Sequence, residues 1–132
     1  MGITHVVTLL NDQSEEKKAR VVERQAKKQG AEWIWLPLQG ASPPPPEDFA
    51  RILAAMRQLR EALAKEDTGV LVHCSAGLHR TGMIANALLR FIGHDEAGAL
   101  EVLRQSREKT ASGVGKHRVA WADTFLAWAK DQ

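Results

Sequence analysis

A cysteine and an arginine separated by five residues stand out in this sequence. The intervening residues are Ser75, Ala76, Gly77, Leu78 and His79. An apolar stretch, Val70 to His73, leads into Cys74, and a helical pattern of apolar residues follows Arg80. Ligands of α/β proteins bind at the carboxyl ends of parallel strands, so a loop in this place predicts a binding site for an anion.

The residue types in this loop suit a phosphate monoester, which carries two negative charges. Backbone N–H groups from Ser75 to Arg80 can form a nest around the anion, and the following helix directs its positive end there. Gly77 tolerates the positive φ that a closed loop needs, and Arg80 offers a planar fork to two phosphate oxygens. The positive electrostatic potential of these groups also favours the thiolate of Cys74, which is the nucleophilic form. We therefore predict Cys74, Arg80 and Thr81 as catalytic residues, with the Thr81 hydroxyl hydrogen-bonded to the thiolate, and residues 75–80 as the phosphate-binding loop.

Three stretches of the sequence resemble known phosphatases. Residues 73–82 are similar to the signature of the protein tyrosine phosphatase superfamily. Residues 2–7 resemble the core strand of dual-specificity phosphatases, and residues 35–45 resemble the acid loop of the phosphatases of regenerating liver. The resemblance implies a phosphocysteine intermediate, no metal, no cofactor, and a substrate such as phosphotyrosine in a protein, with phosphoserine and phosphothreonine as further substrates. Family members have more structure before the first of these strands, so we expect a minimal or truncated form.

The general acid is the main departure from the family pattern. The resemblance places an aspartate directly before Gly40, where this chain has Gln39. An amide cannot supply a titrating proton to the leaving oxygen. Glu47 and Asp48 are the nearest downstream carboxylates, and Asp12 is a third candidate, although all three also suit helix starts. We take Asp48 as the candidate general acid, on reach alone.

Strand-like and helix-like segments alternate along the chain. Asp12 followed by Glu15 resembles a capping box at the start of the first helix, and Gly30 suits its end. The alternation predicts an α/β fold, with a central and mainly parallel sheet flanked by helices, in one compact phosphatase domain of the dual-specificity type over residues 1–132. The predicted strands are 3–10, 31–36 and 70–73, and the predicted helices are 14–29, 47–66, 81–92, 96–108 and 116–129.

Composition narrows the class of protein and of partner. The chain has 132 residues, 44% of them hydrophobic and 26% charged, which is typical of a single globular domain. Its net charge of +2, without a long basic run, gives no reason to expect nucleic acid as a partner. One cysteine excludes an internal disulfide and a cysteine-rich zinc site. With no leader peptide or membrane span in the sequence, we predict a cytoplasmic monomer that acts on a phosphorylated protein or a small phosphate ester, away from membranes.

Other functions fit the same loop less well. A phosphoinositide phosphatase typically has lysines within the loop, where this chain has Leu78 and His79. An arsenate reductase with a thiol relay needs more than one cysteine, and a sulfurtransferase fits the helix that opens at Arg80 less well. A non-catalytic module that binds phosphorylated partners remains an alternative, supported by the missing acid and opposed by the intact Cys74 and Arg80.

Overall fold

The sheet of the protein is parallel and brings the carboxyl ends of its strands to one edge. A computed structural model describes residues 2–39, 42–74, 79–106 and 116–132. Within these residues the strands β1 (His5–Thr8), β2 (Glu32–Trp35) and β3 (Val70–His73) pair in the order β2-β1-β3, both pairs parallel. Thr8 lies opposite Trp35 on one side and His73 on the other. Cys74, the residue after β3, therefore leaves the sheet at the edge that sequence analysis expected.

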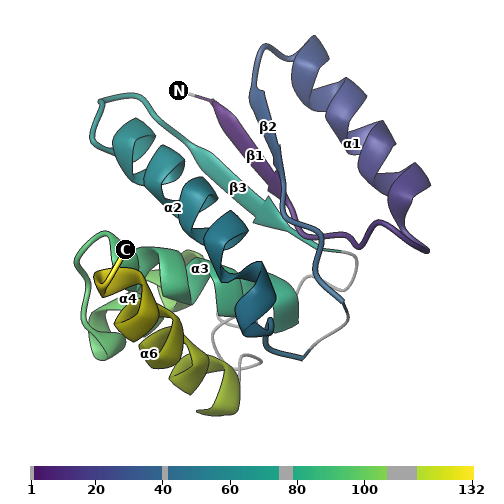
Figure 1. Cartoon of the computed structure of the whole chain (residues 1–132). Coiled ribbons are helices and arrows are strands. Elements are labelled where there is room, and N and C mark those ends of the chain that lie inside the picture. The colour runs from purple at the N-terminus through teal and green to yellow at the C-terminus, as the bar shows by residue number, and fades with distance from the viewer. Residues whose placement is uncertain (1, 40–41, 75–78, 107–115) are drawn as a thin grey trace.

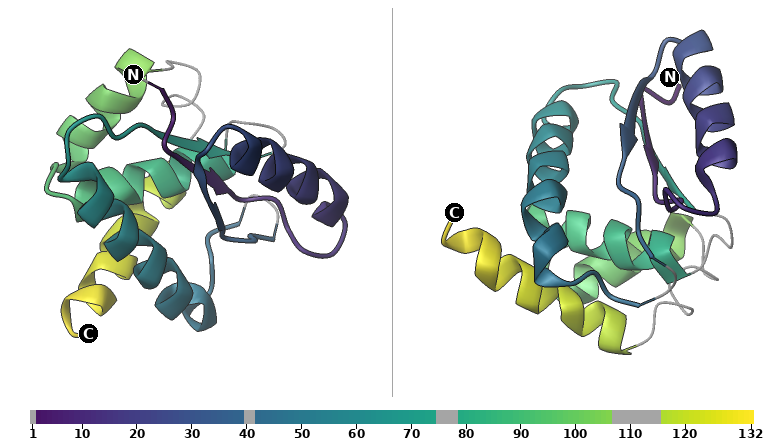
Figure 2. Two further views of the ribbon diagram at one scale, coloured as in Figure 1. Left: turned by 90° about the horizontal axis from the view of Figure 1, so that it is seen from above. Right: turned by 45° about the vertical axis from the view of Figure 1, so that its right-hand side comes forward.

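Helices cover both faces of this sheet (Figures 1 and 2). α1 (Glu16–Lys28) packs on one face, where Val6 and Trp33 contact its buried Ala26. α2 (Phe49–Leu63) and α3 (His79–Phe91) pack on the other face, which carries Val7 and is part of the main core. Val6 and Val7 are neighbours in β1 and point to opposite faces, as expected for a strand that helices cover on both sides. The predicted α/β fold with a mainly parallel sheet is confirmed.

The remaining elements extend the core on the side of α3. A short 3-10 helix, η1 (Pro46–Asp48), leads into α2 after the proline-rich stretch. α4 (Glu96–Ser106) and α6 (Lys116–Lys130) both contact α3. Phe49 packs edge-on against Trp121, Phe125 and Trp128 of α6, and these ring contacts join α6 to the start of α2. Along the described ranges no helix is long and apolar enough to cross a membrane.

The start of α1 differs from the sequence expectation. Asp12 is exposed. Oδ1 of Asn11 instead accepts hydrogen bonds from the backbone N–H groups of Gln13, Ser14 and Glu15, at 3.0, 2.8 and 3.3 Å. Oε1 of Glu15 in turn accepts the N–H of Asn11 at 3.0 Å. The predicted Asp12–Glu15 capping box was therefore wrong. The residue at the cap of α1 is Glu15, which makes no side-chain hydrogen bond to the helix N–H groups, and Asn11 binds the turn that precedes the helix. The assignment of Gly30 to the end of α1 is confirmed by its φ of 79°.

The role of Asn11 in the turn before α1 can be tested by its removal. Asn11→Ala leaves up to three N–H groups of the turn before α1 without their acceptor and should lower the free energy of unfolding by about 0.5–1.5 kcal/mol. Urea denaturation followed by circular dichroism would measure this change. Asp12→Ala is the matched control and should change stability by less than about 0.5 kcal/mol. A larger loss from Asp12→Ala than from Asn11→Ala would contradict the assignment.

Candidate active site

Cys74 and Thr81 meet across the turn between β3 and α3. The sulfur of Cys74 is buried, and the hydroxyl of Thr81 donates a hydrogen bond to it at 3.2 Å. Thr81 is in the first turn of α3, so the positive end of that helix lies on the same side as the sulfur. A hydroxyl donor and a helix N-terminus both favour a thiolate over a thiol.

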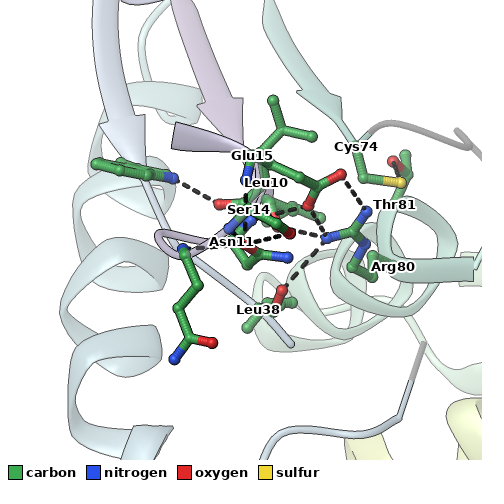
Figure 3. Close-up of polar contacts among 11 residues, drawn as sticks. Leu10, Asn11, Ser14, Glu15, Leu38, Cys74, Arg80 and Thr81 are labelled. Atoms are coloured by element: carbon green, nitrogen blue, oxygen red, sulfur yellow. Dashed lines mark hydrogen bonds and ion pairs between the residues drawn. The ribbon is translucent and has the colours of Figure 1, made fainter. Parts of the chain in front are cut away.

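Arg80 is held between three separate segments of the chain (Figure 3). Its Nη1 donates to Oε1 of Glu15 at 2.8 Å, and its Nη2 donates to Oε2 of the same carboxylate at 3.3 Å. Nη1 also lies 3.3 Å from the carbonyl oxygens of Leu9 and Leu38. The guanidinium is thus fixed by the ends of β1 and of the segment after β2, as well as by Glu15. A two-pronged ion pair with these extra acceptors leaves Arg80 little freedom to turn.

The local electrostatics keep Arg80 charged. The hydrogen bond that Arg80 donates to Glu15 raises the pKa of the guanidinium above its ordinary value, and the charges of Glu15 and Cys74 act in the same direction against the opposing effect of burial. The side chains of Arg80 and Glu15 are only 9% and 14% exposed. At such depth a cation is stable only beside a partner, so the ion pair and the fold depend on each other.

The structure brings together some of the predicted site residues. Cys74, Arg80 and Thr81 converge as the spacing predicted, whereas Ser75, Ala76, Gly77 and Leu78 lie outside the described residues. His79 begins α3, so the helix starts two residues earlier than expected. The catalytic and phosphate-binding roles of these residues stay predictions.

The candidates for the general acid lie apart from one another. Gln39 is exposed and directly follows Leu38, whose carbonyl oxygen accepts a hydrogen bond from Arg80. The segment that contains Gln39 therefore runs beside the site. Asp48 lies at the start of α2, where its Oδ1 accepts from Nη2 of Arg51 at 3.0 Å. Glu47 and Asp12 are exposed. Asp48 therefore has an ion pair to break before it can act elsewhere.

Glu15 is the residue that sequence reasoning missed. It was interpreted as part of a helix cap, yet its carboxylate binds Arg80 with both oxygens. A signal was present in the sequence, because Glu15 follows the first strand and must lie at the sheet edge where Cys74 emerges. An arginine expected in a buried loop also requires a carboxylate partner.

Comparison with known proteins agrees with this geometry. The model of the family described as "Swiss Army Knife protein, DSP-PTPase phosphatase domain" matches residues 1–122. The chain belongs to this family. It is therefore a cysteine-dependent phosphatase of the dual-specificity type, as the resemblance implied. No curated protein matches the sequence.

Solved structures share the fold of this phosphatase domain. A kinase associated phosphatase (KAP) with serine in place of its catalytic cysteine has a TM-score of 0.77 at 17% identity, over 99% of this chain and 72% of the other. Tk-PTP in its active form has a TM-score of 0.67 at 23% identity, over 98% and 80% of the two chains. A putative protein tyrosine phosphatase from Leishmania major has a TM-score of 0.59 at 17% identity, over 92% and 71%.

The Glu15–Arg80 ion pair predicts a double effect of substitution at Glu15. Glu15→Gln leaves a buried guanidinium without its anion and should lower the free energy of unfolding by about 1–3 kcal/mol. It should also lower kcat/KM for an aryl phosphate by about tenfold or more, because the phosphatase then holds Arg80 less firmly. Urea unfolding and steady-state kinetics measure the two effects.

The neighbouring carboxylate provides a matched control. Glu16 is 55% exposed and lies 3.8 Å from Arg20, so Glu16→Gln should change stability by less than about 0.5 kcal/mol and leave kcat/KM unaltered. Equal effects of the two substitutions would show that Glu15 acts only through the net charge of α1.

Proposed function

We propose that this phosphatase hydrolyses phosphotyrosine in proteins through a covalent phosphocysteine intermediate, and that phosphoserine and phosphothreonine are slower substrates. The observation that carries the proposal is the convergence of Cys74, Thr81 and the Glu15-fixed Arg80 at the carboxyl end of β3. Residues 75–80 bind the phosphate with their backbone N–H groups. Residues 1–132 act as one phosphatase domain, and the lone thiol nucleophile suits a reducing cytoplasm.

The reaction has two steps at phosphorus. The Cys74 thiolate attacks the phosphorus, an S–P bond forms, and the P–O bond to the substrate breaks, with a proton delivered to the leaving oxygen. Water then attacks the phosphocysteine, the S–P bond breaks, and inorganic phosphate leaves as the thiolate is restored. Arg80 binds two phosphate oxygens through both steps, and the Thr81 hydroxyl stabilises the departing thiolate by the hydrogen bond at 3.2 Å.

Asp48 is our candidate for the group that protonates the leaving oxygen. Its pair with Arg51 is at the surface, where such a pair contributes about 0–1 kcal/mol, so releasing the carboxylate requires little free energy. Glu15 is unsuited to this role, because Arg80 occupies both of its oxygens. The proline-rich segment before η1 would have to carry Asp48 toward the substrate.

Substitution of the nucleophile tests the proposed function directly. Cys74→Ser should abolish release of phosphate from p-nitrophenyl phosphate and from a phosphotyrosine peptide, while binding of vanadate persists because Arg80 and the backbone donors remain. Arg80→Lys should impair both activity and vanadate binding, since an ammonium cannot replace a planar fork. Activity in EDTA should equal activity without it. Retention of more than a few per cent of activity by Cys74→Ser would refute the mechanism.

Amide substitutions test the general acid. If Asp48 donates the proton, Asp48→Asn should lower kcat by about 10²–10⁴-fold for esters with poor leaving groups and remove the basic limb of the pH profile. It should also steepen the dependence of rate on leaving-group pKa, because aryl phosphates with good leaving groups need little protonation. The measurement is kcat over a series of aryl phosphates. Glu47→Gln, one residue earlier and exposed, is the matched control. Identical slopes for wild type and Asp48→Asn would exclude Asp48.

A further inference from the structure

A chain of partly buried hydrogen bonds ends at the residue that precedes Cys74. Nε1 of Trp33 donates to Oγ1 of Thr8 at 2.8 Å, and the same oxygen lies 2.7 Å from Nε2 of His73. Thr8 is fully buried, with 0% of its surface exposed. The three side chains come from three different strands, so the chain of bonds crosses the whole sheet just before its carboxyl edge.

Strand register explains why these side chains meet. Thr8 lies opposite His73 in β3, and Trp33 is two residues before Trp35, the partner of Thr8 in β2. Residues opposite one another, or two apart along a strand, point to the same face of a sheet. That face is the one covered by α1, since Trp33 packs against the cluster that contains Ala26.

The number of protons available determines which atom donates. An indole N–H can only donate, so Thr8 accepts from Trp33. The Thr8 hydroxyl proton then needs an acceptor, and among the residues that the structure describes only Nε2 of His73 is within reach. Every group is satisfied when Thr8 donates to Nε2 and the histidine proton is on Nδ1. Burial lowers the pKa of His73 below its ordinary value, which agrees with a neutral ring.

We propose that Thr8 is a positioning residue for the reaction, which holds His73 as a neutral ring protonated at Nδ1 and so fixes the main chain that presents Cys74. The inference rests on the proposed role of Cys74 as nucleophile. In this tautomer the proton is on Nδ1, the ring nitrogen nearer the main chain of His73, the residue that directly precedes Cys74. A ring held in this way restrains that peptide, and the thiolate keeps its place relative to Arg80 and Thr81.

Among the residues that the structure describes, Arg20 and Arg80 are the cations nearest to Trp35 and Cys74, and both are paired. On α1, Arg20 stacks on Trp35 and pairs with Glu16 and Glu23. At the carboxyl edge of the sheet, Glu15 pairs with Arg80. Histidine protonation would add a cation beside these pairs and remove the acceptor of Thr8. The neutral state is therefore the one that the surrounding structure supports.

Alkylation of Cys74 by iodoacetamide provides the test, because it reports the thiolate without any turnover. Thr8→Val keeps the shape of the side chain but removes its hydroxyl, leaving Nε2 of the half-buried His73 without this donor. We expect its alkylation rate at pH 6 to fall by about three- to tenfold, the effect of one hydrogen bond on an equilibrium, with an unchanged plateau at high pH. Thr8→Ser, which restores the hydroxyl, should return the profile to that of wild type.

The chain offers a matched control just before the same strand begins. Thr4 Oγ1 also bonds a histidine, at 2.9 Å from Nδ1 of His5, but far from Cys74 along β1. Thr4→Val should therefore leave the alkylation profile unchanged, although it removes a comparable contact and the two bonds between Oγ1 and the main chain of Gly69. Trp33→Phe, which removes only the outer donor, should give a smaller shift than Thr8→Val. Thermal unfolding of each variant confirms that the folded protein is measured.

Several results would overturn the inference. These are an alkylation profile of Thr8→Val that overlaps wild type, an equal shift from Thr4→Val, and a failure of Thr8→Ser to restore the profile. Failure of the proposed function would appear differently, as wild-type protein that releases no phosphate while its thiol still titrates.

Discussion

The ion pair between Glu15 and Arg80 is the constraint on which the site depends. It joins the segment that enters α1 to the first turn of α3, and its cation also contacts the carbonyl groups of Leu9 and Leu38. One guanidinium therefore ties the ends of two strands to the helix that follows the nucleophile. A buried charge requires its partner, so these segments can pack together only when all of them are in place.

The parallel pairing of the three strands explains why Arg80 can be held at their carboxyl ends. Because β1, β2 and β3 all end at one edge, their last residues and the loops that follow them meet there. Glu15, Leu38 and Cys74 each follow a different strand. On the α1 face, the hydrogen bonds from Trp33 through Thr8 to His73 lie close to the same edge.

Much of the fold could be predicted from the sequence, since apolar periodicity and glycine positions mark the elements. The strand from Val70 to His73 agrees with prediction at both ends, and each predicted helix overlaps an observed one. The predicted capping box was wrong, because Asn11 and Asp12 are equally suited by type to bind free N–H groups, and in the structure Asn11 binds those of the turn before α1. The single segment from 47 to 66 also divides into η1 and α2.

The sequence by itself determined the local chemistry of this protein: a thiol, a guanidinium and a hydroxyl at positions 74, 80 and 81, where a strand gives way to a helix. Short separations along the chain fix such groups near one another whatever the rest of the molecule does. Only the tertiary structure decided the partners of those groups, Glu15 for Arg80 and Thr8 for His73, each 65 residues away. Their contacts depend on strand order and register, which pair residues far apart in the chain and leave no local pattern.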